Sequence, residues 1–177
     1  MTEKSICHPL RPVCVLLNLI SAHLYRKNFM SPNLTEPLIT DDTTIRFLDA
    51  TQEQKQVSSD PTVAYTAGPF DLTATSHGAM SNKQLIQATG VVTLTTSTAS
   101  KALTQELSFE LGSLCMAMMP LLRGEQCIVL RTQISDVQLD PNSTFFLATT
   151  AVNISLGYPV WNVTELEGIL REIRINV

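Results

Sequence analysis

Charged and aromatic residues are scarce in this chain. Of its 177 residues, 16% are charged and 6% are aromatic, whereas charged residues make up about 25% of an ordinary globular domain. Serine and threonine take their place and crowd residues 93–104 and 142–155. The net charge is −4, so the chain offers no basic field that would hold DNA or an anionic membrane. The composition therefore argues against a nucleic-acid-binding protein.

Glycine is sparse and evenly spread. The chain has seven glycines, and no two of them are neighbours in a short motif. A phosphate-binding loop needs clustered glycines, because backbone N–H groups must approach the anion closely. The spacing therefore excludes a local P-loop and a local dinucleotide-binding fingerprint.

The four cysteines are Cys7, Cys14, Cys115 and Cys127, and they form no CxxC motif. Four are too few for a disulfide-dense scaffold. Their positions in apolar runs favour buried free thiols. Cys7, His8 and Cys14 are close in sequence, but no second cluster completes the four ligands of a zinc site. We expect no metal and no cofactor.

No catalytic motif is recognisable. His8, His23 and His77 have no serine, cysteine or carboxylate at a motif spacing. Glu106 and Glu110 would share one face of a helix, which is an arrangement that acid–base catalysis uses. An exposed helix face is the commoner place for such a pair. We therefore predict that the protein is not an enzyme and has no catalytic, cofactor-binding or metal-binding residues.

The N-terminal region predicts a helix over residues 13–29, with Pro12 in its first turn. Its apolar face would carry Val13, Leu16, Leu17, Ile20, Leu24 and Tyr25. The alternative is a signal peptide, because Lys4 and Arg11 precede a short apolar run. Glu3 and Asn18 count against that alternative, and the run is too short to span a bilayer.

Residues 31–90 are weakly patterned and contain several prolines. Residues 43–48 and 61–67 could each form a strand. A long irregular stretch in a compact domain is commonly functional. The segment is either a surface loop or an extended insertion that docks as an arm on a neighbouring subunit.

Residues 91–177 form the clearest part of the pattern. Alternation over 91–96 predicts a strand, and Ser100 offers a cap for a helix over 100–120. The apolar stripe of this helix would be Leu103, Leu107, Leu111, Leu114, Met118 and Leu121. Its polar face would carry Thr104, Gln105, Glu106, Ser108 and Glu110. We also expect Met116 to pack in the core.

Two strands, 128–134 and 146–156, would then form a hairpin. Ile128, Leu130, Thr132 and Ile134 alternate with Val129, Arg131 and Gln133. Phe146, Ala148, Thr150, Val152, Ile154 and Leu156 would share one face of the second strand. Gly157 and Pro159 should end that strand. A capping box from Thr164 to Glu167 predicts a short helical turn, and Ile173, Ile175 and Val177 predict a last strand.

These elements predict a single α+β domain over residues 1–177. The N-terminal helix and the central amphipathic helix would pack on one face of a mostly antiparallel sheet.

The order of elements from Gly90 to Val177 resembles the tail terminator (tail completion) proteins of long-tailed bacteriophages. The resemblance rests on the strand after Gly90, the capped helix, the Asp140-Pro141 turn and the Tyr158-Pro159-x-Trp161 segment. It implies a non-enzymatic structural protein of the virion neck. In that family, six copies form a ring that caps the tail tube. The Thr-rich residues 31–90 depart from the family, which leaves the role of the arm open.

The resemblance also implies partners and a location. The partners would be other copies of the chain, tail tube and sheath proteins, and a connector or stopper protein on the head side. DNA would pass through the lumen without specific binding, and no membrane would be involved. The protein would reside in the virion neck or tail, and in the host cytoplasm during assembly.

Two other classes of function remain open from the sequence. One is a secreted or envelope-associated viral β-rich protein, to which the signal-like segment and four N-x-S/T sequons point. The other is a small hydrolase whose site, around His77, is assembled only in three dimensions.

Overall fold

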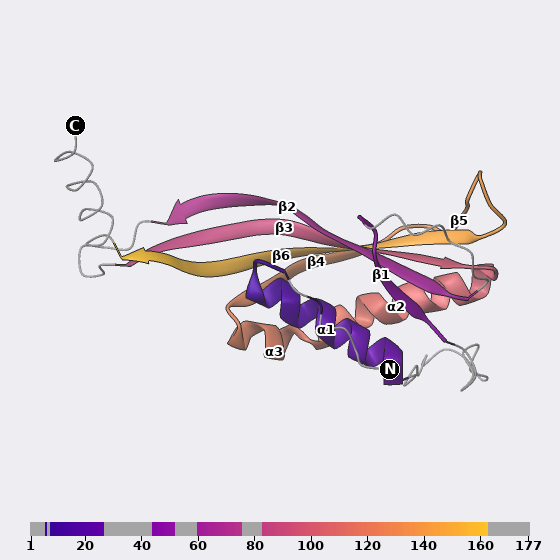
Figure 1. Cartoon of the computed structure of the whole chain (residues 1–177), viewed down its shortest axis with the longest axis horizontal. Coiled ribbons are helices and arrows are strands. Elements are labelled where there is room, and N and C mark those ends of the chain that lie inside the picture. The colour runs from indigo at the N-terminus through magenta and orange to yellow at the C-terminus, as the bar shows by residue number, and fades with distance from the viewer. Residues whose placement is uncertain (1–5, 7, 27–43, 52–59, 76–82, 163–177) are drawn as a thin grey trace.

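All described strands of the protein lie in one sheet, and all described helices lie on one side of it (Figure 1). The structure, a computed structural model, describes residues 6, 8–26, 44–51, 60–75 and 83–162. In chain order the elements are α1 (Arg11–Arg26), β1 (Arg46–Asp49), β2 (Thr62–Thr75), β3 (Lys83–Thr98), α2 (Lys101–Ala117), α3 (Met119–Gly124), β4 (Cys127–Ile134), β5 (Gln138–Leu139) and β6 (Phe146–Asn162). This arrangement confirms the predicted α+β class.

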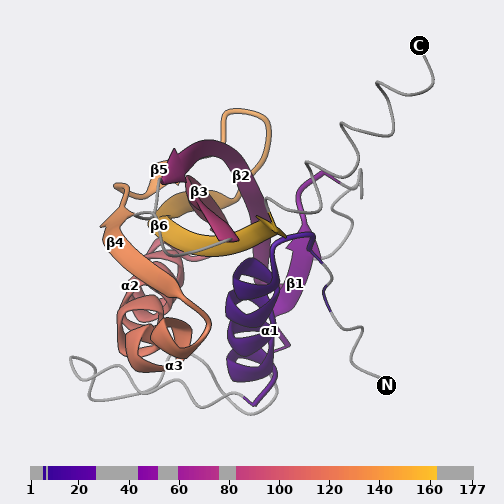
Figure 2. The same cartoon turned by 90° about the vertical axis from the view of Figure 1, so that its left-hand side faces the viewer.

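The strand order is β1-β2-β3-β6-β4, and β5 pairs with β6. Strands β1 and β2 are parallel, and the other described pairs are antiparallel. β2, β3 and β6 are 14, 16 and 17 residues long, about three times the usual strand length. They extend as a blade beyond the helices, which lie side by side beneath the other half of the sheet (Figures 1 and 2).

Helix α1 presents the predicted apolar face to the core. Val13, Leu16, Leu17, Ile20 and Leu24 are all buried. Tyr25 is 68% exposed, so its assignment to that face was wrong. The helix begins at Arg11 rather than residue 13, with Pro12 in its first turn, and residues 27–29 lie outside the described part.

Helix α2 begins where predicted but ends earlier. The Ser100 side chain accepts a hydrogen bond from the Leu103 N–H at 3.4 Å. Leu107 and Leu111 are fully buried. Leu121, predicted on the same stripe, is 62% exposed. The reason is that α2 stops at Ala117 and α3 starts a new helix, so the periodicity does not continue across the break.

Hydroxyl groups, rather than aliphatic side chains alone, seat α2 on the sheet. Thr104 and Ser108 were predicted on the polar face but are fully buried. The Thr104 and Thr98 hydroxyls are 2.8 Å apart, and the Ser108 hydroxyl donates to the Thr104 carbonyl at 2.7 Å. The Thr150 hydroxyl of β6 donates to the Ser108 carbonyl at 3.2 Å. Because each hydroxyl has a partner, burying these small polar groups carries little penalty.

Strand β4 does not follow the simple alternation that its sequence suggests. Ile128 and Leu130 are 50% and 57% exposed, whereas Val129 is buried. A bulge between Val129 and Arg131 shifts the register with β6. Such a bulge inserts one extra residue and so changes which residues face each side of the sheet. Ile128 and Leu130 were therefore predicted on the wrong side of the sheet.

Residues 31–90 are more regular than expected. The weak signals at 43–48 and 61–67 correspond to β1 and to the start of β2. β2 continues to Thr75, and β3 begins at Lys83 rather than after Gly90. Pro69 hid this continuity in the sequence, because it lies in a bulge between Ala67 and Phe70. The rest of the predicted arm, at 31–43, 52–59 and 76–82, lies outside the described residues.

Strand β6 runs past its predicted end. It continues through Gly157 and Pro159 to Asn162, because β3 extends far enough to pair with it there. The predicted capping box at Thr164 and Glu167 and the predicted last strand lie outside the described residues.

Candidate functional site

His8 and the turn carboxylate Asp140 lie in separate, local settings. His8 Nδ1 accepts the Leu10 N–H at 3.1 Å. Asp140 accepts hydrogen bonds from the Asn142 N–H and the Ser143 hydroxyl, and these bonds lower the pKa of its carboxyl. His77 lies outside the described residues. Neither His8 nor Asp140 is therefore paired in the way that an acid–base site requires.

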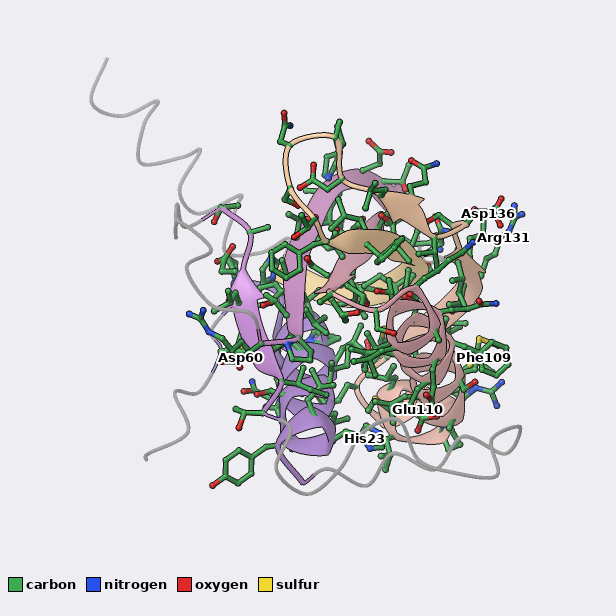
Figure 3. The ribbon with its side chains drawn as sticks, turned by 90° about the vertical axis from the view of Figure 1, so that its right-hand side faces the viewer. His23, Asp60, Phe109, Glu110, Arg131 and Asp136 are labelled. Carbon is green, nitrogen blue, oxygen red and sulfur yellow. The ribbon has the colours of Figure 1, made fainter. Side chains whose placement is uncertain are left out.

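Glu106 and Glu110 are less exposed than the sequence suggested. His23 Nε2 of α1 lies 3.5 Å from Glu110 Oε1 of α2, with side-chain exposures of 21% and 16%, and the two residues face each other in Figure 3. Burial, and secondarily the charge of Glu110, raise the pKa of Glu106. One Glu106 oxygen is buried without a hydrogen bond in the described structure. His23 and Glu110 therefore join the two helices.

Two hollows of similar volume lie on the surface of the described residues. One, of about 490 Å³, is lined by Ile86, Gln87, Arg123, Gln126, Ile128, Ser155 and Gly157. The other, of about 450 Å³, is lined by Lys101, Gln105, Phe109, Ile134, Ser135, Asp136 and Val137. Neither contains the His23–Glu110 pair or a cysteine. The second brings Ser135, Asp136 and Lys101 together, and the Ser135 hydroxyl there donates to the Asp136 backbone carbonyl at 3.1 Å.

The described cysteines are structural. Cys14, Cys115 and Cys127 are free thiols, as predicted. Burial raises the pKa of Cys115 to about 12 and that of Cys127 to about 11. Such thiols stay protonated near neutral pH and are poor nucleophiles. Within the described ranges no group of three or more histidine, cysteine or acidic residues could hold a metal ion.

The face of the sheet opposite the helices, here called the outer face, is uncharged at its centre. Cross-strand pairing places these half-buried residues on it: Ala64, Thr66, Val91, Thr93, Thr95, Thr149, Ala151 and Asn153. The charged residues Asp71 and Arg131 lie at opposite margins of this face, opposite Thr89 and Asn153 respectively. The described helices leave this face uncovered (Figure 1).

A second surface lies where α2 meets the edge strand β4. Phe109, Met116 and Ile134 are 50%, 45% and 41% exposed. Ile134 lies over Gly112, whose position would place a Cβ atom 2.9 Å from Ile134 Cδ1. The Thr132 hydroxyl lies 3.5 Å from Met116 Sδ. We call Phe109, Gly112, Met116, Thr132 and Ile134 the apolar strip.

The apolar strip was missed in the sequence. Met116 was predicted to pack in the core, but its side chain is partly in solvent. Phe109 and Met116 are seven positions apart and therefore lie on one helix face, which was the available signal. Figure 3 shows Phe109, Arg131 and Asp136 on one side of the molecule and Asp60 on the opposite side.

Neither the comparison with protein-family models nor that with curated protein sequences gives a match to this chain. In the described part of the chain, no helix combines the length and the hydropathy that a membrane span requires.

Proposed function

We propose that this protein is a structural component of a bacteriophage neck. In this proposal several copies form a ring that caps the tail tube and joins the tail to the connector or stopper protein of the head. The number of copies, six, follows from the family resemblance. The tail tube is the first partner, and sheath proteins are further partners if the tail is contractile.

The observation that carries the proposal is the outer face. Three long strands present a broad surface of threonine, alanine, valine and asparagine there, with the charged residues Asp71 and Arg131 at its margins. A surface without charges can be desolvated in a protein contact without the cost of stripping water from ions. The outer face is therefore suited to contact with protein.

The electrostatics support the same role. With a net charge of −4, a ring of these subunits would repel rather than retain passing DNA. The described residues include buried thiols with raised pKa values and a His23–Glu110 pair that joins α1 to α2. These features suit a protein that acts through its surfaces.

The test is to determine the assembly state of the full chain. Light scattering at micromolar concentration should give a mass near six times 19.5 kDa, either in solution or after addition of tail tubes. Negative-stain electron micrographs should show rings with a central hole, or tubes capped at one end. A protein that remains monomeric and does not bind tubes would contradict the proposal.

A further inference from the structure

We propose that the β4 edge of the sheet in one subunit pairs with the β2 edge of the sheet in a neighbouring copy of this chain. Residues 131–134 of one copy would lie beside residues 70–73 of the next, and the two sheets would become continuous. This inference deepens the proposed function, on which it rests for the ring, because it assigns the contact between subunits.

Both strands have an open edge in the described part of the chain. β4 is the last strand in the sheet order, so within the described residues no strand pairs with its outer side. β1 pairs with β2 over Thr62–Tyr65, whereas β2 continues to Thr75. The described structure therefore leaves the edge of β2 open beyond Tyr65. Open strand edges are templates for pairing with another chain.

The backbone groups that β4 offers at its open edge belong to Thr132 and Ile134. The Ser135 N–H donates to the Thr149 carbonyl of β6 at 2.8 Å. In an antiparallel ladder, pairs of opposite residues that exchange two hydrogen bonds alternate with pairs that exchange none. Gln133, two positions before Ser135, therefore bonds to β6 as well. Thr132 and Ile134 consequently point their N–H and C=O groups away from β6, toward the open edge.

The backbone groups that β2 offers at its open edge belong to Phe70 and Leu72. Thr73 lies opposite Gln87 of β3, and the Thr73 hydroxyl donates to the Gln87 carbonyl at 3.4 Å. That carbonyl therefore points toward β2, which makes Thr73 and Gln87 a hydrogen-bonded pair. By the same alternation, Phe70 and Leu72 point their N–H and C=O groups away from β3. The open edges of β2 and β4 can therefore exchange hydrogen bonds.

The side chains on the helix side of the two edges are complementary. Leu72 lies opposite the buried Ala88 and so belongs to the helix side, but it is 66% exposed, because the helices do not extend beneath this half of the sheet (Figure 1). On β4, the Thr132 hydroxyl lies 3.5 Å from Met116 Sδ of the apolar strip. With Leu72 opposite Thr132 of the neighbour, the leucine would contact Met116 and Ile134, which are 45% and 41% exposed. Strand addition combines main-chain hydrogen bonds with side-chain contacts of this kind.

The side chains on the outer face carry opposite charges. Asp71 and Arg131 are exposed there, and neither forms an ion pair with another described residue. Placing Leu72 opposite Thr132 puts Asp71 opposite Gln133 and diagonal to Arg131. Diagonal neighbours across two strands are about 7–8 Å apart, a distance that a long side chain spans. The same register therefore satisfies the backbone, the apolar side chains and the charges.

The strand directions fit a ring. β3 is antiparallel to β2 and to β6, and β6 is antiparallel to β4, so β4 runs antiparallel to β2. A neighbour placed beside the sheet with its helices on the same side would therefore present an antiparallel β2 to β4. Because this contact joins two unlike edges, it repeats from copy to copy and generates a ring when the rotation closes.

A disulfide experiment on the full chain tests the pairing. Protein carrying Asp71→Cys is mixed at micromolar concentration with protein carrying Gln133→Cys and oxidised with copper phenanthroline. Mass spectrometry should find a disulfide between positions 71 and 133, because opposite residues in adjacent strands lie within the Cα separation that a disulfide bridges. Ala99→Cys, at an exposed position outside both edges, replaces Gln133→Cys in the control. The control should give at least about tenfold less crosslinked product.

Exchange of the two charges tests the predicted ion pair. Arg131→Asp should raise the protein concentration needed for half-maximal assembly about tenfold, because Asp71 then meets a like charge. Asp71→Arg should have a similar effect. The variant that combines both substitutions should assemble like the unmodified protein, because the exchange restores opposite charges. Light scattering over a dilution series measures all three variants.

A leucine substitution tests the helix side of the contact. Leu72→Asp should raise the concentration for half-maximal assembly at least about tenfold, as expected when an apolar anchor is replaced with a charge. Leu121→Asp is the matched control, because Leu121 is 62% exposed but lies on α3, and it should leave assembly unchanged. Thermal melts of both variants should match that of the unmodified protein, which separates loss of contact from loss of fold.

The outcomes separate this proposal from the neck role. Absence of the disulfide between positions 71 and 133, or charge reversals that the combined variant does not rescue, would each overturn the edge pairing. Rings that cap tail tubes without that disulfide would leave the proposed function intact. Copies that form the disulfide but neither close into rings nor bind tubes would support the edge pairing and count against the neck role.

Discussion

At the scale of single residues, Gly90 shows why a glycine stands in the middle of a long strand. Gly90 lies opposite Phe70 on β2. A Cβ atom at this position would overlap the Phe70 ring and lie 2.7 Å from the Pro69 carbonyl oxygen. Glycine weakens a strand in general, and it is retained where another group approaches the backbone closely. The bulge at Pro69 and the glycine on β3 therefore depend on each other.

Gly90→Ala should lower the free energy of unfolding by about 1–3 kcal/mol, the usual cost of overpacking. Gly124→Ala is the matched control, because no heavy atom lies within 4 Å of its Cβ position, and it should change stability by less than about 0.5 kcal/mol. Urea denaturation followed by circular dichroism measures both. Equal midpoints for the two variants would show that Phe70 moves aside at no cost.

Glu106 should make stability depend on pH. Its raised pKa means that the folded chain holds the proton more tightly than the unfolded chain. The resulting stabilisation is complete below the ordinary glutamate pKa of 4.5 and is lost as pH rises through the raised pKa. Glu106→Gln, which is neutral at every pH, should remove this loss and raise the Tm at neutral pH.

The pKa of Asp140 is shifted in the opposite direction to that of Glu106. Its lowered pKa gives a stabilisation that is present above the ordinary aspartate pKa of 3.8 and is lost as pH falls through the lowered pKa. Asp140→Asn should therefore change the acid side of a Tm–pH curve, whereas Glu106→Gln changes the curve above pH 4.5. A Glu106→Gln curve parallel to that of the unmodified protein would contradict the assigned cause.

At the scale of elements, α2 combines three roles on different faces. Leu107 and Leu111 enter the core, Thr104 and Ser108 bond to one another and to the adjoining strands, and Phe109 contributes to the apolar strip. The apolar stripe was readable from the sequence because leucines recur at helical spacing. The buried hydroxyls were not, because threonine and serine commonly lie on exposed faces and only their partners on β3 and β6 make them buried.

Leucine-to-alanine substitutions along the predicted apolar stripe should distinguish buried residues from exposed ones by their effect on stability. Leu107→Ala should cost about 2–5 kcal/mol, because Leu107 is fully buried. Leu121→Ala should cost less than about 0.5 kcal/mol, because Leu121 is 62% exposed on α3. Thermal melts of the two variants at one pH decide the matter, and a larger loss for Leu121 would mean that the α2–α3 break is misplaced.

At the scale of the whole molecule, helices cover one face of the sheet and leave the other for contact. The centre of the outer face spans three strands, with half-buried small residues such as Thr93 and Ala151 opposite each other. In the proposed neck ring, this face meets another protein.

Thr93→Lys combined with Ala151→Lys should abolish binding to tail tubes, because two buried charges would lack partners in the contact. The Tm and the mass of the ring should stay within error of the unmodified protein. Ala99→Lys, at an exposed position between β3 and α2, is the control and should leave tube binding unchanged. Co-sedimentation with tubes and light scattering measure the two outcomes, and unimpaired tube binding by the double variant would exclude the outer face.

The sequence by itself determined the α+β class, the face of β6, the face of α1 apart from Tyr25, and the start of α2, because periodicity and capping are local properties. Only the tertiary structure decided the length of β2 and β3, the bulge in β4 and the burial of Thr104 and Ser108. Each of these depends on a partner far away in the chain. Strand pairing extends Ala- and Thr-rich segments that are weakly predicted alone. A bulge changes which residues face each side of the sheet without changing the composition of the strand. The apolar strip belongs to the same class, since Ile134 and Phe109 become one surface only when β4 lies against α2.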